Sequence, residues 1–177
     1  MPESNVVFRS QSFFSKAAVD AEKPNRGWFR IGRETPVVSD EEAFLTILIG
    51  AARADDVVSP EEAQELSALA LRTRTLSKLT LARIAELQKH IDDKINRDGL
   101  ETILGAACSS ILGSSEQGEL VRVRAESVFA HAVDLVFADR AITLSEQAYI
   151  EQLARSLRLD PDRARSIVAL IEIKNAY

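Results

Sequence analysis

The sequence predicts an all-α fold: about seven helices form a pseudo-twofold bundle from two repeats, each containing a helix-turn-helix, with an irregular N-terminal arm. Two observations predict it. Apolar residues recur at helical spacing between residues 39 and 177, where no strand-like alternation is found. Residues 54–62 (ADDVVSPEE) also align with residues 138–146 (ADRAITLSE), 84 positions further on. A unit that occurs twice predicts two similar halves of one helical domain.

Each copy of the repeat has the same order of elements. An apolar helix ends at Ala-Asp, a tight turn follows, and a hydroxyl residue then opens a second helix with Glu three places later. The hydroxyl residue and the glutamate are Ser59 and Glu62 in the first copy, and Thr143 and Glu146 in the second. This spacing is a capping box, in which the two side chains bond reciprocally to backbone amides. The pattern predicts where a helix begins in each half.

Capping signals also place the other helices. A box at Ser39–Glu42 opens the first helix. Pro60 takes the first position of the second helix, where its missing N–H costs nothing. The third helix runs from Ser77 or Thr80 to Ile95. The last four helices are expected to begin at residues 98–101, near Ser115 (ending at Ala138–Asp139), after Thr143 and after Asp160.

Apolar residues at helical spacing indicate the buried side of each helix. The short side chains at residues 105–108 (GAAC) of the fourth helix predict the close approach of a neighbouring helix. The apolar positions are Ala43, Leu45, Ile47, Leu48, Ala51 and Ala52 in the first helix, Leu79, Ile84, Leu87 and Ile91 in the third, and Ile167, Leu170 and Ile171 in the seventh.

Composition excludes several classes of protein. With 177 residues and 46% hydrophobic content, the chain is long enough for one buried core. A net charge of −5 and a pI near 5.2 give no electrostatic reason to bind nucleic acid. One cysteine rules out an intramolecular disulfide. A secretory signal and an apolar run of the roughly 20 residues that span a bilayer are both missing, so a cytoplasmic location is expected.

Residues 1–38 differ from the rest of the chain. They hold six Lys/Arg and four Asp/Glu, a net charge of +2, which leaves −7 for the helical domain of residues 39–177. Because disordered tails are poor in aromatic residues, we expect this arm to pack as a lid on the domain. The alternative is an arm that docks on a partner or a membrane. Five of the ten aromatic residues lie in the arm: Phe8, Phe13, Phe14, Trp28 and Phe29.

The two acidic turns are the candidate binding site. If the repeats pack about a pseudo-twofold axis, Asp55, Glu62, Asp139 and Glu146 converge, and such an oxygen-rich cluster suits Ca²⁺, Mg²⁺ or Mn²⁺, with Zn²⁺ also possible. Two further carboxylates, Asp56 and Asp134, are additional candidate ligands.

The alternative is that these residues only shape the turns. Capping explains both glutamates, and aspartate is common in turns. A role in shaping the turns explains the two aspartates less well. Asp55 and Asp139 each follow a helix C-terminus, where the helix dipole disfavours negative charge.

Other chemistry-bearing residues are weaker candidates. His90 and His131 lack a second ligand at zinc or di-iron spacing, although Asp134 lies one turn after His131 and an ion pair is open to them. Cys108 has small apolar neighbours in a helix and is typical of a core residue. No phosphate-binding loop or nucleophile elbow is present, so no enzymatic activity is expected.

At the acidic turns the chain resembles the TerB-like (tellurite resistance protein B) family, over residues 40–175 or so. That family has two helical repeats, each with Ala-Asp-Gly, an aliphatic residue, Ser/Thr and then Glu. The resemblance implies a bundle of about seven helices, no catalysis, divalent-cation binding at the acidic positions, and protein partners in stress or metal-resistance machinery, in the cytoplasm or linked to a membrane. The matching positions are Asp55, Val58, Ser59 and Glu62, then Asp139, Ile142, Thr143 and Glu146.

One departure from the family pattern bears on the ion. The glycine that follows Asp is replaced by Asp56 in the first copy and by Arg140 in the second. Arg140 brings a cation to the second acidic turn, and if it folds inward it neutralises the carboxylates in place of a metal. Two functions therefore stay open: a TerB-like accessory protein of a tellurite-resistance or general stress response that binds a divalent cation, and a metal-free helical protein–protein interaction module. Homo-oligomer formation is open in both.

Overall fold

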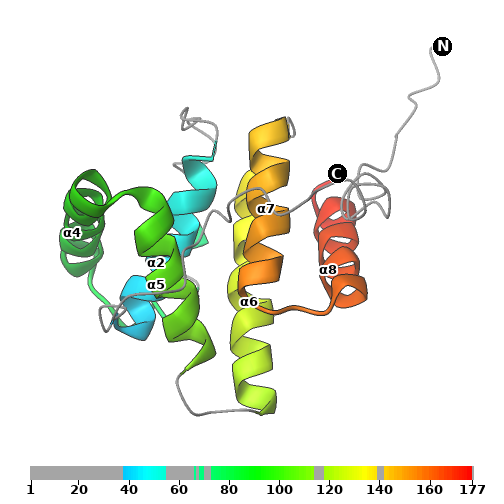
Figure 1. The fold of residues 1–177 in the computed structure, drawn as a ribbon, viewed down its shortest axis with the longest axis horizontal. Coiled ribbons are helices and arrows are strands. Elements are labelled where there is room, and N and C mark those ends of the chain that lie inside the picture. Colours follow the sequence, from blue (N-terminus) through cyan, green and yellow to red (C-terminus); the bar gives the residue numbers. More distant parts are fainter. Residues whose placement is uncertain are drawn as a thin grey trace.

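The computed structural model describes residues 38–54, 66, 68–69, 73–113, 118–138 and 142–176. Over these residues the fold is all-α, as predicted, with six helices and no strand. None of the described helices is long and apolar enough to cross a membrane. The predicted arm and most of the predicted second helix lie outside the described residues. The helices are α2 (Asp40–Ala52), α4 (Leu81–Asp98), α5 (Leu100–Leu112), α6 (Glu119–Val136), α7 (Leu144–Ser156) and α8 (Pro161–Lys174) (Figure 1).

Helix α2 is the centre of the fold. It contacts α4, α5, α6 and α7, and every residue from Ala43 to Ala52 is buried. The expected buried stripe is therefore too narrow a description. The segment FLTILIGAA is apolar on all sides except at Thr46, which is typical of a helix surrounded by others. Ser39 caps it as predicted, with its hydroxyl accepting the Glu42 N–H at 3.2 Å.

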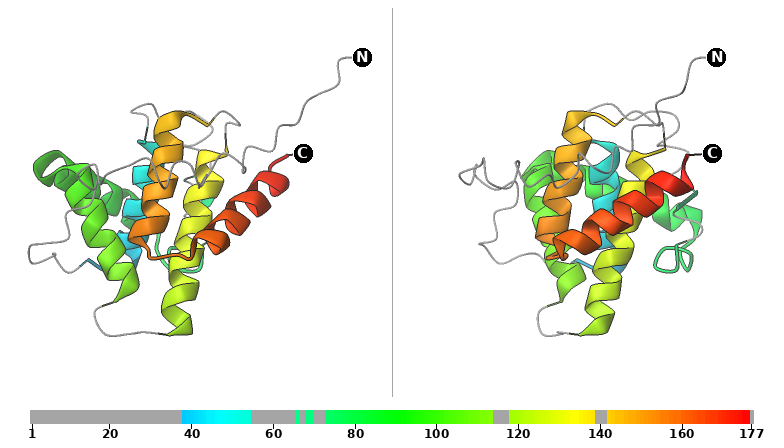
Figure 2. Two further views of the ribbon diagram at one scale, coloured as in Figure 1. Left: turned by 45° about the vertical axis from the view of Figure 1, so that its right-hand side comes forward. Right: turned by 90° about the vertical axis from the view of Figure 1, so that its right-hand side faces the viewer.

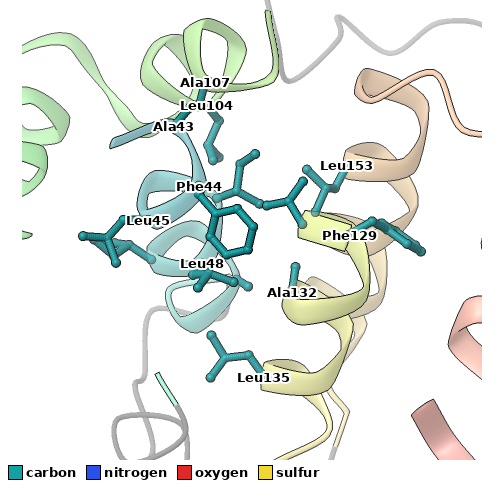
Figure 3. Packing of buried hydrophobic residues seen from close by; sticks show 14 of the residues in the cluster. Ala43, Phe44, Leu45, Leu48, Leu104, Ala107, Phe129, Ala132, Leu135 and Leu153 are labelled. Atoms are coloured by element: carbon teal, nitrogen blue, oxygen red, sulfur yellow. The ribbon is translucent and has the colours of Figure 1, made fainter. Parts of the chain in front are cut away.

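The core lies between α2 and its neighbours. Figure 3 shows Phe44 and Leu48 of α2 on the side that faces α6, where Ala132 and Leu135 lie, whereas Phe129 of α6 points to the side away from α2. Leu104 and Ala107 of α5 close one side of this cluster, and Leu153 of α7 closes another (Figure 3). Because the large side chains come from four helices, the core fixes the positions of α2, α5, α6 and α7 together.

The close approach predicted at residues 105–108 is present, and all four residues are buried where α5 packs on α2. A residue in close contact lies on the α2 side as well. A Cβ atom at Gly50 would lie 2.8 Å from Leu104 Cδ2 and 2.8 Å from the Tyr149 hydroxyl. That hydroxyl donates to the carbonyl of Ile47 at 2.7 Å, so α2, α5 and α7 meet around Gly50.

Most predicted helix starts are correct. Thr80, Thr143 and Asp160 cap α4, α7 and α8 through side-chain oxygens. The fifth predicted helix starts later than expected, at Glu119 instead of near Ser115. The reason is Gly118, whose extended backbone (φ 173°, ψ 179°) precedes the first helical residue. In α4, Ile84, Leu87 and Ile91 are buried as their spacing predicts.

Helices α2 and α6 end with the same pattern of backbone hydrogen bonds, a pattern that α7 also shows at Leu157 and Arg158. The Arg53 N–H donates to Ile49 O at 3.1 Å, and its equivalent 84 residues later, Phe137, donates to Val133 O at 3.1 Å. The next residues, Ala54 and Ala138, both donate to the carbonyl three positions back, at 3.2 and 3.0 Å. Helices α2 and α6 therefore end in the same way, directly before Asp55 and Asp139.

Candidate functional site

The second acidic turn is described from Ile142 onwards, and it contains a complete capping box. The Glu146 N–H donates to Thr143 Oγ1 at 3.2 Å, and the Thr143 N–H donates to Glu146 Oε2 at 2.6 Å. Thr143, Leu144 and Ser145 are exposed, whereas Glu146 is only 2% exposed. Its carboxylate therefore lies on the inner side of the turn.

Asp134, an additional candidate ligand, is held by two residues of the C-terminal segment. Lys174 Nζ lies 2.7 Å from one carboxylate oxygen and 2.6 Å from the other, and Asn175 Nδ2 donates to Oδ1 at 2.9 Å. The Asp134 side chain is 10% exposed. Its immediate chemical role is to attach the end of α8 to α6 through an ammonium group.

The remaining candidate ligands, Asp55, Asp56, Glu62 and Asp139, lie outside the described residues, and so does Arg140. Within the described part of the chain, no three His, Cys, Asp or Glu side chains are grouped so that they could hold a metal ion. Of the six predicted site residues, the structure therefore describes two, Glu146 and Asp134. Neither belongs to a group of described residues that could hold a metal ion.

The histidines and the cysteine occupy the kinds of position that the sequence predicts. His90 is exposed, with Nε2 3.8 Å from Glu42 Oε1. His131 is partly buried and meets the ring of Phe44 edge-on, with 5.6 Å between ring centroids. Cys108 is 3% exposed, and burial raises the pKa of its thiol to about 12, so it stays protonated at neutral pH.

An ion pair that local spacing does not reveal joins the first turn of α2 to the C-terminal part of α4. Glu42 Oε1 lies 2.5 Å from Lys94 Nζ, and their side chains are 13% and 16% exposed. Glu42 was expected to complete the first capping box, but its carboxylate reaches across to α4 instead. Glu42 and Lys94 are 52 residues apart along the chain, so the residues around Glu42 could not predict this ion pair.

Helix α8 has an unpredicted feature on its outer side. Leu170, which the sequence analysis placed on the buried side of this helix, is instead 66% exposed, so that prediction is wrong, and Ile173 is 57% exposed. Ala164 and Val168, on the opposite side, are fully buried. Figure 1 shows α8 at the edge of the molecule beside α6. Helix α8 is therefore apolar on two sides, and only one of them faces the core.

No protein-family model, curated protein or solved structure matches this chain. The resemblance to the TerB-like family accordingly rests on the residues of the two acidic turns, and it stays a prediction.

Proposed function

We propose that this protein is a TerB-like accessory protein of a tellurite-resistance or general stress response, in which a divalent cation binds across the two acidic turns. The observation that carries the proposal is the sequence repeat: an aspartate follows α2 and another follows α6 at equivalent positions, Asp55 and Asp139, each three residues after the helix ends. The described ends agree with this repeat, since the equivalent residues Arg53 and Phe137 each donate to the carbonyl four positions back. We propose further that the two halves are related by a pseudo-twofold axis that brings these turns together.

A bound cation would offset the unfavourable electrostatic interaction between each aspartate and the helix C-terminus before it. A carboxylate after a helix C-terminus is disfavoured by the partial negative charge of that terminus, and Asp55 and Asp139 both occupy this position. Glu146 caps α7 through Oε2, which accepts the Thr143 N–H, and a carboxylate can accept at about four lone-pair sites in all. Hard cations such as Ca²⁺, Mg²⁺ and Mn²⁺ prefer oxygen ligands of this kind.

The proposed ligand set is Asp55, Glu62, Asp139 and Glu146. Asp134 is left out because Lys174 and Asn175 already bond to its two oxygens. A metal at Asp134 would have to displace an ammonium group that lies within 2.7 Å of both oxygens.

Glu146→Gln tests the proposal because glutamine also completes a capping box. Thermal unfolding is measured for the EDTA-treated protein with and without each of Ca²⁺, Mg²⁺, Mn²⁺ and Zn²⁺. We expect one ion to stabilise the wild type, by about 2.7 kcal/mol at a hundredfold excess over its Kd. Glu146→Gln should unfold like the wild type without metal and lose that gain. Glu101→Gln, at an exposed first-turn glutamate of α5, is the matched control and should keep it.

The second candidate is a metal-free protein–protein interaction module, and the exposed apolar side of α8 favours it. Here Leu170→Ser with Ile173→Ser should abolish the capture of a protein partner from cells, with no response to any ion. A double variant at two exposed leucines elsewhere, Leu81→Ser with Leu144→Ser, should capture the same partner as the wild type. Equal capture by all three proteins would reject α8 as the docking side.

A further inference from the structure

Helix α8 carries two small residues and two large apolar ones on its outer side. Leu170 and Ile173 are 66% and 57% exposed, Ser166 is exposed and Ala169 is partly buried. Their spacing of i, i+3, i+4 and i+7 places these four residues, the α8 strip, on one side of the helix. The Ser166 hydroxyl donates to the Asp162 carbonyl at 2.8 Å, so a contact that covers Ser166 does not leave this donor without a partner.

No described helix covers the α8 strip. In the right-hand panel of Figure 2, α8 lies in front of the other helices. One charged residue lies on the same side of α8, Asp162, one turn before Ser166. Its carboxylate pairs with Arg165 at the N-terminal end of the helix. The uncharged part of this side therefore begins at Ser166.

We infer that the α8 strip binds the α8 strip of a second copy of the chain, with the two helices antiparallel. A twofold axis that passes between residues 169 and 170 brings Ser166 opposite Ile173 of the second copy, and Ala169 opposite Leu170 of the second copy. Each large side chain then meets a small one, which lets the two helices pack closely. Because a twofold axis makes every contact reciprocal, the same match occurs on both copies.

The charges on one flank of the strip also match in this arrangement. Arg165 and Glu172 lie on the same flank of α8. The twofold axis is perpendicular to both helices, so it brings this flank of one copy beside the same flank of the other. Arg165 of each copy then lies beside Glu172 of the other, about 3 Å away along the helix axis. Two reciprocal pairs of opposite charge result.

The remaining charges do not oppose the pairing. On the other flank, Arg163 and Lys174 lie beside the same residues of the second copy, but each is already paired with a carboxylate of α6. Arg163 lies 2.8 Å from Glu126, and Lys174 lies 2.6 Å from Asp134. Asp162 would lie opposite residue 177, which is beyond the end of α8 at Lys174, so its charge stays at the rim of the contact.

The size of the strip predicts weak association. A stable complex buries about 800 Å² on each partner. Helix α8 has 14 residues and is about 21 Å long, so one side of it offers only part of that area. We therefore expect monomer and dimer in exchange, with the dimer at high protein concentration. A second copy is favoured over an unrelated partner because this one helix supplies both halves of the small–large match and of the charge match. The pairing is independent of cation binding.

Analytical ultracentrifugation of the EDTA-treated protein, from micromolar to millimolar concentration, measures the association. We expect the wild-type mass to rise from monomer to dimer. Leu170→Ser with Ile173→Ser should abolish that rise, whereas Leu81→Ser with Leu144→Ser, at exposed leucines of α4 and α7, should keep it. Far-UV circular dichroism checks that each variant is folded. Equal association of all three proteins would overturn the inference. A wild type that stays monomeric would also overturn it, and would leave the strip to a different protein.

Exchange of the flank charges tests the antiparallel arrangement itself. Arg165→Glu and Glu172→Arg should each weaken self-association several-fold, because each places like charges beside one another across the twofold axis. An equal mixture of the two variants should associate more strongly than either variant alone, since both pairs between the helices then have opposite charges. A mixture that associates no more strongly than its components would contradict the antiparallel pair.

Discussion

The Asp134 carboxylate receives the Lys174 ammonium group almost symmetrically, at 2.7 and 2.6 Å from its two oxygens. The two residues are 40 positions apart and join the C-terminal turn of α8 to α6. Lysine near a helix C-terminus is also favoured by the helix dipole. Helix α8 is therefore held by buried Ala164 and Val168, by partly buried Ile167 and Ile171, and by two ion pairs to α6, of which this is one and Arg163–Glu126 the other.

Lys174→Met should therefore destabilise the protein. The change removes the cation from a carboxylate that is 10% exposed, while the lysine itself is 52% exposed, so the cost lies between that of a surface pair and a buried pair, about 1–2 kcal/mol. Urea denaturation measures it as a lower midpoint. Lys89→Met, at an exposed lysine of α4, is the control. Equal midpoints for both variants would show that the pair contributes nothing.

Gly50→Ala should destabilise the protein, although alanine is the better helix former by about 1 kcal/mol. The added Cβ would lie 2.8 Å from both Leu104 Cδ2 and the Tyr149 hydroxyl, and both side chains are fully packed in the core. Overpacking of this kind costs about 1–3 kcal/mol. Thermal unfolding in the absence of metal measures the net effect. A higher melting temperature would mean that α5 and α7 move apart at little cost.

Alkaline pH should weaken the fold through Cys108. Burial raises the pKa of this thiol from 9.0 to about 12. A group whose pKa is raised by folding stabilises the native state fully below its unfolded pKa, and that contribution is lost as pH rises through the folded pKa. Stability should thus fall between about pH 9 and pH 12, by up to about 1.4 kcal/mol per pH unit for this one proton.

Cys108→Ala isolates this contribution. Its stability should fall less steeply than that of the wild type above about pH 9, where the free thiol begins to ionise. Burial also raises the pKa of Tyr149, so Tyr149→Phe should reduce the slope at still higher pH. Identical slopes for the wild type and Cys108→Ala would contradict the burial argument.

The capping box of α7 predicts that substitutions of its two residues reduce the stability of the protein by different amounts. Thr143→Ala removes the hydroxyl that accepts the Glu146 N–H and should cost about 1 kcal/mol. Glu146→Gln keeps an oxygen for the Thr143 N–H and should cost much less when no metal is present. Denaturant midpoints of the two variants check this. A large loss for Glu146→Gln would mean that the buried carboxylate needs its charge for the fold itself.

Local sequence predicted what depends on local contacts. Thr143, Asp160 and Ser39 were identified as caps because an N-cap side chain bonds to amides two or three residues away. The buried positions of α4 followed from its spacing for a similar reason, since its other side faces solvent.

Tertiary contacts decided the rest. The patch at residues 105–108 predicted a close helix approach, but the sequence did not show that Gly50 would lie in close contact with Leu104 and Tyr149, because that depends on which helix packs there. The Glu42–Lys94 and Asp134–Lys174 pairs join residues 52 and 40 positions apart, and nothing in the local pattern marks them. The meeting of the two acidic turns is a prediction of the same long-range kind.

Isothermal titration calorimetry of the EDTA-treated protein tests cation binding most directly. Wild type, Asp55→Asn with Asp139→Asn, and Glu146→Gln are each titrated with Ca²⁺, Mg²⁺, Mn²⁺ and Zn²⁺. We expect saturable binding of one ion by the wild type, weaker by at least about tenfold in both variants, since even indirect support of a metal is worth that much. Absence of heat with every ion, or equal binding by all three proteins, would contradict the proposed site.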